Sequence, residues 1–189
     1  MKRLALAFTL LAGLTGLTGC GDGVASEEEA ERAYLGLDAS IDRAIGLGFD
    51  GFNAASSANI PPQTANGTKG GKMIIGGKVD QGASNNKTMS LTITLEAYTD
   101  DELLIYDTDP AALPVLDMKL SKIPDGTLEG SLNGTFLMSG ELEGPVRLSL
   151  SFAGDLEPAG DGVQRKAGTT TITGSADSDF GIYEVDVTR

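Results

Sequence analysis

The sequence predicts a mainly β protein with one N-terminal helix, and two apolar periodicities carry that prediction. Apolar residues recur every three to four positions through residues 27–52, which is the repeat of an amphipathic helix. From residue 72 onward they recur at every second position, which is the repeat of strands with one buried face. A stretch rich in Ala, Ser, Asn, Gly and Pro separates the two regions.

The helix is expected to span about residues 27–45. Ser26 and Glu29 have the spacing of a capping box at its start. Glu28 and Arg32 have the spacing of an ion pair along one helical face. Glycines beyond residue 45 leave the end of the helix open. The apolar stripe, which we expect to pack on the rest of the domain, comprises Ala30, Ala33, Tyr34, Leu37, Ile41, Ala44, Ile45, Phe49 and Phe52.

Residues 53–71 are predicted to be a linker, because Pro61 and Pro62 exclude a helix there. Residues 72–188 are predicted to form an antiparallel meander of about six to eight strands, which could curl into a half-barrel around the helix. The clearest strand covers residues 88–98. Its inward residues are expected to be Met89, Leu91, Ile93, Leu95 and Ala97.

Two hairpin signals compete in the middle of the sheet. Asn133-Gly134 is typical of a two-residue hairpin turn. Leu132 and Phe136 share one parity, however, which favours a strand that runs through Gly134 as a bend or bulge. The hairpin is therefore placed at a loop of residues 143–145, which pairs Phe136 with Phe152.

The C-terminal part of the sheet is predicted from composition and alternation. Residues 157–166 are rich in Gly, Asp and Pro and are expected to be a loop. Residues 169–176 are expected to form a polar strand near an edge of the sheet. Residues 180–188 alternate again and are expected to be the last strand, with Tyr183 among the inward residues.

The composition excludes several kinds of site. The chain has no His, one Cys and no Trp, so it cannot form a Ser-His-Asp or Cys-His centre, an imidazole metal site or an internal disulfide. Acidic residues outnumber basic ones by 27 to 14, which gives a net charge of −13. Nucleic acid would repel such a domain. We therefore expect no enzymatic activity, no cofactor and no nucleic-acid partner.

The N-terminus has the pattern of an export signal. Lys2 and Arg3 precede an apolar run that is too short for a bilayer-spanning helix, which needs about 20 apolar residues. The run ends in Leu17-Thr18-Gly19-Cys20, with the only cysteine of the chain. This box resembles the signal of bacterial lipoproteins. The resemblance covers the first 20 residues only, so the mature domain is not assigned to a family.

The lipoprotein resemblance implies a processing route and a location. Cleavage between Gly19 and Cys20 would remove residues 1–19, and Cys20 would carry the diacylglyceryl group and an amide-linked fatty acid such as palmitate. Residues 20–25 would be a tether and residues 26–189 a single domain. Loss of Lys2 and Arg3 would leave 12 basic and 27 acidic residues, and so a net charge of −15. A glycine after the cysteine, in place of aspartate, favours the outer membrane in a Gram-negative envelope.

Two Asp-x-Asp motifs are the only candidates for a metal site. Clustered carboxylates in a turn can bind Ca²⁺, as Asp177 and Asp179 would do between two strands. Asp107 and Asp109 have the same spacing. Neither motif has the full spacing of an EF-hand, and aspartates that bond to their own backbone turns are the preferred interpretation.

Three functions fit these observations, in decreasing order of preference. The first is an envelope protein that binds another protein or has a structural role. The second is a carrier of lipid or another hydrophobic ligand inside a half-barrel, by analogy of fold alone. The third is a hydrolase that works with carboxylates only. A helix that occupies the apolar side of the sheet favours the first function, and an open cavity there favours the second.

Overall fold

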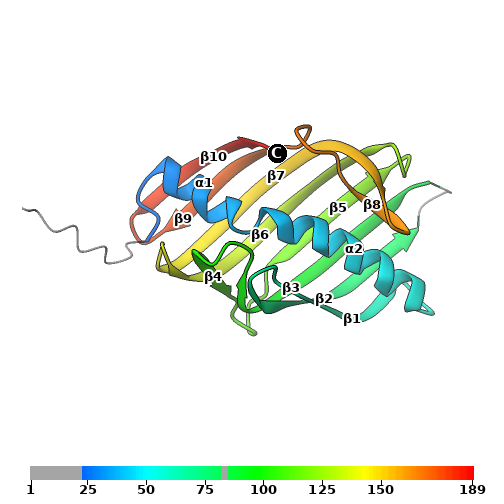
Figure 1. Ribbon diagram of the computed structural model, residues 1–189, viewed down its shortest axis with the longest axis horizontal. Coiled ribbons are helices and arrows are strands. Elements are labelled where there is room, and N and C mark those ends of the chain that lie inside the picture. Colours follow the sequence, from blue (N-terminus) through cyan, green and yellow to red (C-terminus); the bar gives the residue numbers. More distant parts are fainter. Residues whose placement is uncertain (1–22, 82–84) are drawn as a thin grey trace, which may run out of the picture.

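The computed structural model describes residues 23–81 and 85–189 (Figure 1). Two consecutive helices lead into ten antiparallel strands that form one sheet, so the predicted mainly β fold with a helical N-terminal segment is confirmed. The helices are α1 (Glu27–Leu35) and α2 (Asp38–Ala54). The strands are β1 (Asn59–Asn66), β2 (Gly70–Gln81), β3 (Lys87–Thr99), β4 (Leu104–Asp107), β5 (Val115–Ser121), β6 (Thr127–Gly140), β7 (Gly144–Ala159), β8 (Gly162–Arg165), β9 (Thr171–Ser178) and β10 (Gly181–Thr188).

The ten strands occupy eight side-by-side positions in the sheet. β4 and β5 both pair with β3 and with β6, so together they act as one interrupted strand. β8 and β9 share one edge of β7 in the same way. With these pairs counted once, the order across the sheet follows the order along the chain, and the sheet is a meander with β1 and β10 at its edges.

The helices cross one face of this sheet from edge to edge (Figure 1). α1 packs against β10, and α2 packs against β1, β2 and β8. The sheet curls around them, and its two edge strands are not paired with each other. Inward side chains of the strands and the helical stripe form one continuous core, whose largest fully buried members include Tyr34, Tyr98, Tyr106 and Phe136.

The helical segment is longer than predicted and is broken once, at Gly36 and Leu37. Ser26 caps α1 by accepting a hydrogen bond from the Glu29 amide. The end of the helical segment, which the glycines beyond residue 45 left open, lies at Ala54. A Cβ atom on Gly48 would lie 2.8 Å from Met89 Sδ, so α2 continues along the sheet where a larger residue would push it away.

The predicted stripe is confirmed as the buried side of the helices. Its members are at most 7% exposed except Phe52, which is half-buried against the core. The predicted pair between Glu28 and Arg32 is wrong. Arg32 bonds instead to Asp101 at 2.8 Å and to Glu141 at 2.8 Å, on two loops of the sheet. Tertiary contacts therefore replace the local helical one.

The predicted linker contains a strand, which corrects the assignment of residues 53–71. β1 pairs with β2 along the edge of the sheet, with a register irregularity between Ile60 and Gln63. Pro61 and Pro62 lie at that irregularity. Proline lacks an N–H donor, and an edge strand with an irregular register is one of the few places in a sheet that accepts it.

The alternation predicted for residues 88–98 holds as far as Leu95 and then fails. Met89, Leu91, Ile93 and Leu95 are buried, but Ala97 is exposed and Tyr98 is fully buried. Ala97 has a φ of 47°, and the β2–β3 register shifts opposite this point. An extra residue in one strand changes which of the following residues face inward. After the bulge at Ala97, Tyr98 therefore points into the core.

The β6–β7 hairpin has the predicted parity but a different register. β6 runs through Gly134 without a shift in its pairing to β7, so the interpretation as a continuous strand is confirmed. Phe136 pairs with Val146 and not with Phe152. The turn lies at residues 141–143, and the predicted loop at 143–145 is wrong. A register slip by an even number of residues keeps every side chain on its face, so alternation alone does not fix the register.

Gly134 yields a test of this packing. Its φ is 153°, and an added Cβ would lie 2.5 Å from the Cα atom of Pro114, in the segment between β4 and β5. Gly134→Ala should therefore lower the free energy of unfolding by roughly 1–3 kcal/mol. Gly46→Ala is the matched control, because nothing lies within 4 Å of its added Cβ, and it should stabilise α2 by roughly 0.5–1 kcal/mol. Urea denaturation measures both; equal effects would contradict the close approach at Pro114.

Candidate functional site

The residues singled out in the sequence do not come together in a site. Gly19 and Cys20 lie outside the described residues, so their predicted roles are not tested. Asp177, at the end of β9, and Asp179, in the turn to β10, are both exposed. Within residues 23–81 and 85–189, no group of three His, Cys, Asp or Glu side chains is arranged to hold a metal ion.

The carboxylates of the other Asp-x-Asp motif, Asp107 and Asp109, accept hydrogen bonds from backbone amides. The Asp107 carboxylate accepts a hydrogen bond of 2.8 Å from the amide of Ala97, at the bulge of β3. The Asp109 carboxylate accepts one of 2.8 Å from the amide of Ala111, two residues further on. The interpretation of Asp109 as a turn residue is confirmed, and Asp107 stabilises an irregular backbone segment in a neighbouring strand.

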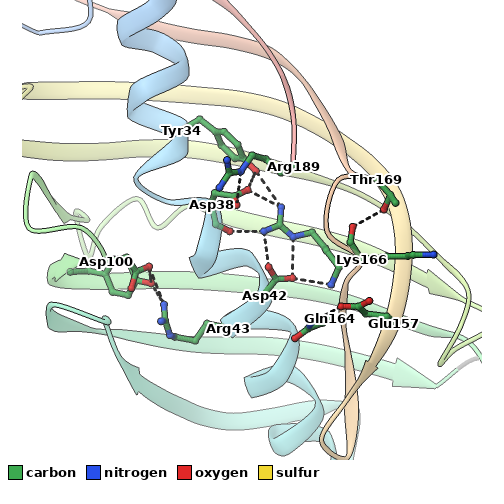
Figure 2. Close-up of polar contacts among 12 residues, drawn as sticks. Tyr34, Asp38, Asp42, Arg43, Asp100, Glu157, Gln164, Lys166, Thr169 and Arg189 are labelled. Atoms are coloured by element: carbon green, nitrogen blue, oxygen red, sulfur yellow. Dashed lines mark hydrogen bonds and ion pairs between the residues drawn. The ribbon is translucent and has the colours of Figure 1, made fainter.

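A cluster of charged side chains where α2 meets β8 is the most elaborate polar site in the described part of the chain. Figure 2 shows Asp38 and Asp42 of α2 together with Tyr34 and Arg189 around this point. At its centre is Arg165, whose side chain is only 5% exposed. Its guanidinium bonds to Asp42 through Nε at 3.0 Å and through an Nη at 2.8 Å, which is a bidentate ion pair.

The remaining donors of Arg165 are also satisfied. One Nη atom bonds to the Asp38 carboxylate at 2.9 Å and lies 3.4 Å from the Tyr34 hydroxyl. The other Nη atom, besides its bond to Asp42, donates to the Asp38 carbonyl oxygen at 2.8 Å. A guanidinium has five N–H donors, and these contacts account for all of them. Arg165 thus has no donor left for a ligand.

Asp38 is held by three neighbours at once. Besides Arg165, it accepts a 2.6 Å hydrogen bond from the Tyr34 hydroxyl and pairs with Arg189 at 3.3 Å. Burial alone would raise the pKa of Asp38, but the bonds from Arg165, Tyr34 and Arg189 outweigh it and hold that pKa below its usual range. Burial and the adjacent Asp38 carboxylate raise the pKa of Tyr34, so the phenol stays protonated.

A surface depression of about 520 Å³ opens beside this cluster. The residues that line it are mostly polar: Asp38, Asp42, Gln164, Arg165, Lys166, Ala167, Gly168, Thr188 and Arg189. Two arginines and two aspartates give the cluster no net charge. Arg165 is fully bonded and Asp38 is ionised, so neither serves as a free cationic fork or as a protonated carboxyl for acid catalysis. The geometry indicates that this cluster, called the clasp below, has a structural role and holds α2 against β8.

Two further arginine contacts hold the helices at other points. Arg43 of α2 bonds to the Tyr98 hydroxyl, pairs with Asp100 at 3.2 Å and lies over the Tyr98 ring. Tyr98 in turn donates to Asp100 at 2.5 Å. On α1, Arg32 bridges Asp101 and Glu141. Burial would raise the pKa of Asp100, but hydrogen bonds from the Tyr98 hydroxyl, the Thr68 amide and Arg43 outweigh it and lower that pKa. Backbone amides and Arg32 lower the pKa of Asp101 in the same way.

The sequence prediction missed the central cluster because it placed Arg165 in a loop. β7 in fact continues to Ala159, and residues 162–165 return as β8, which directs Arg165 at the helix. One signal was available: Tyr34, Asp38 and Asp42 are spaced four apart, so on a helix they share one face beside the apolar stripe. Acidic residues at the border of a buried face predict a basic partner, but the spacing does not identify which residue that is.

Known proteins give no assignment for this chain. No family model, curated protein or solved structure matches it. Of the helices in the described ranges, none is both long enough and apolar enough to cross a membrane. Function must therefore be inferred from the side-chain geometry and from the N-terminal sequence.

The clasp can be tested by removing its cation. Arg165→Met would leave Asp38 and Asp42 without their buried partner, and it should lower the free energy of unfolding by roughly 3–5 kcal/mol. Lys72→Met is the matched control. It breaks a surface pair with Glu96 in which both side chains are more than 40% exposed, and it should cost at most about 1 kcal/mol. Denaturant unfolding compares the two, and a similar loss in both would refute the role of burial.

The lowered pKa of Asp38 predicts sensitivity to acid. The folded state binds this proton less readily than the unfolded chain, in which Asp has a pKa of about 3.9. The ionised cluster therefore stabilises the fold above about pH 4, and this contribution is lost as the pH falls through the folded pKa. Asp38→Asn should be less stable near neutrality and should show a shallower acid-side decline. Unfolding at a series of pH values measures this, with the exposed Asp177→Asn as control; an unchanged slope in Asp38→Asn would rule the cluster out as the source.

Proposed function

We propose that this chain is a lipid-anchored protein of the cell envelope, on the outer membrane in a Gram-negative cell. Its folded domain, residues 26–189, would be a non-catalytic binding or structural module. The observation that carries the proposal is the position of the helical segment, which lies on the apolar face of the sheet. Lipid attachment at Cys20 rests on the Leu17–Cys20 box alone.

The filled interior favours a module over a hydrophobic carrier. A carrier needs an apolar wall that a ligand can reach, as pockets for small molecules commonly have. Here the inward side chains of the strands pack against the helical stripe, and Met89, Leu91 and Ile41 are at most 1% exposed. The depression at Arg165 is lined largely by charged and polar groups, which suits a hydrophobic ligand poorly.

The state of the carboxylates favours binding over hydrolysis. A carboxylate hydrolase needs one acid whose pKa is raised, so that it carries a proton at working pH. The carboxyls with a resolved shift in the described part of the chain, Asp38, Asp100 and Asp101, are all shifted downward and bonded to arginine. These groups are ionised and structurally engaged, which is unsuited to general acid catalysis.

Replacement of Cys20 tests the anchor. Cys20→Ala removes the thiol that would accept the lipid, so the protein should leave the membrane fraction after a high-salt wash while its domain keeps its β-rich circular dichroism. Gly21→Ala, which keeps the cysteine, is the matched control and should remain with membranes. Retention of Cys20→Ala on washed membranes would show that something other than a lipid on Cys20 holds the protein.

Crosslinking tests the binding role. A module that works by association should yield the same crosslinked partner repeatedly when living cells are treated with a short-range crosslinker and the protein is recovered from the envelope. Arg165→Met protein is the control for folding, because a specific partner should require the intact domain. Repeated recovery of uncrosslinked protein alone would count against a binding role and leave the structural one.

A further inference from the structure

The large exposed apolar side chains of the described residues gather at one end of the sheet. They are Phe180, Ile182, Leu103 and Leu137, which are 57%, 71%, 55% and 44% exposed. Single exposed apolar residues are common on protein surfaces and need no explanation. Four such residues at the same end of the sheet do call for an explanation.

Strand pairing places these four residues together. Phe180 lies in the β9–β10 turn, and Ile182 is the second residue of β10. Leu137 lies near the end of β6, opposite Pro145 at the start of β7. The Leu103 carbonyl accepts a 2.9 Å hydrogen bond from the amide of Glu141, in the β6–β7 turn. β7 and β9 are also paired, so the two turns lie at the same end of the sheet.

The chain enters the domain at this same end. A Cβ atom added to Gly23 would lie 2.8 Å from the Phe180 ring and 3.1 Å from the Glu143 carbonyl oxygen, so Gly23 sits between the two turns. Val24 is buried, and its carbonyl accepts a 2.5 Å hydrogen bond from the Ser178 hydroxyl. These contacts fix the start of the domain beside Phe180.

The position of Cys20 then limits how far this end can be from a membrane. Gly23 follows Cys20 by three positions in the sequence, and a fully extended chain over three positions spans only about 10 Å. A lipid on Cys20 would hold the β6–β7 and β9–β10 turns within that distance of the bilayer. Apolar side chains so close to an interface gain free energy by entering it.

We infer that this end of the sheet is a membrane-contact surface, with Phe180 and Ile182 inserted at the boundary between the lipid headgroups and the acyl chains. The inference rests on the proposed lipid anchor and adds an orientation to it: the strands stand away from the bilayer and the anchor end contacts it. Glu141, Glu143 and Asp179 lie in the same turns and are exposed. The occupant is therefore a lipid surface with little net negative charge, because anionic headgroups would repel these acids.

The absence of tryptophan makes the orientation measurable. Phe180→Trp and, independently, Ile182→Trp each introduce a single fluorophore at the surface. The lipidated full-length protein is reconstituted in phosphatidylcholine vesicles with brominated acyl chains, which quench tryptophan on contact. Lys119→Trp is the matched control. Lys119 is exposed and pairs with Glu129, which lies roughly 35 Å along β6 from Gly140 at the anchor end.

The inference predicts that both anchor-end tryptophans lose most of their emission in brominated vesicles and shift to the blue, while the control keeps its emission. Intact mass and vesicle flotation report the anchor separately. Protein that carries the acyl mass and floats, but whose anchor-end tryptophans are unquenched or match the control, overturns the contact surface and leaves the proposed anchor standing. Protein that lacks the acyl mass and does not float overturns both.

Discussion

The packing of one amphipathic helical segment on one face of a single sheet is the constraint on which this structure depends. The strands of the meander place most of their buried apolar side chains on one face, and a sheet with an apolar face must cover it with another layer. Here the chain supplies that layer from its own N-terminus, and α1 and α2 run from the β10 edge to the β1 edge. Tyr106 is buried beneath these helices and donates a 2.8 Å hydrogen bond to the Ala33 carbonyl oxygen of α1.

Apolar packing has little directionality, so polar contacts define the position of α1 and α2 on the sheet. Arg32, Arg43 and Arg165 each join a helix to the strands or loops, at separate points along the segment. Burial decides how much each contact contributes. Arg165 is nearly inaccessible and fully bonded, whereas Arg32 is partly exposed to water that screens its charge. The chain is poor in basic residues, and these three serve its architecture.

Charged and apolar side chains are distributed unequally over the outside of the domain. The chain has 27 acidic and 14 basic residues, while the large exposed apolar residues of its described part concentrate at the end where the chain enters. With the proposed lipid on Cys20, this end would lie near a membrane. The bilayer would then cover the exposed apolar residues, and acidic residues elsewhere would oppose a flat orientation on an anionic surface.

The sequence by itself determined which residues point inward, because that information is local: a period of two or of about 3.6 follows from the geometry of one strand or one helix. The stripe from Ala30 to Phe49, the inward residues from Met89 to Leu95 and the passage of β6 through Gly134 were all predictable in this way. Only the tertiary structure decided the register of the β6–β7 hairpin, the bulge at Ala97, the edge strand at Pro61 and the pairing of Arg165 with Asp38. Each of these depends on contacts between segments distant along the chain, 127 residues apart for Arg165 and Asp38, and no local pattern encodes which distant partner will be met.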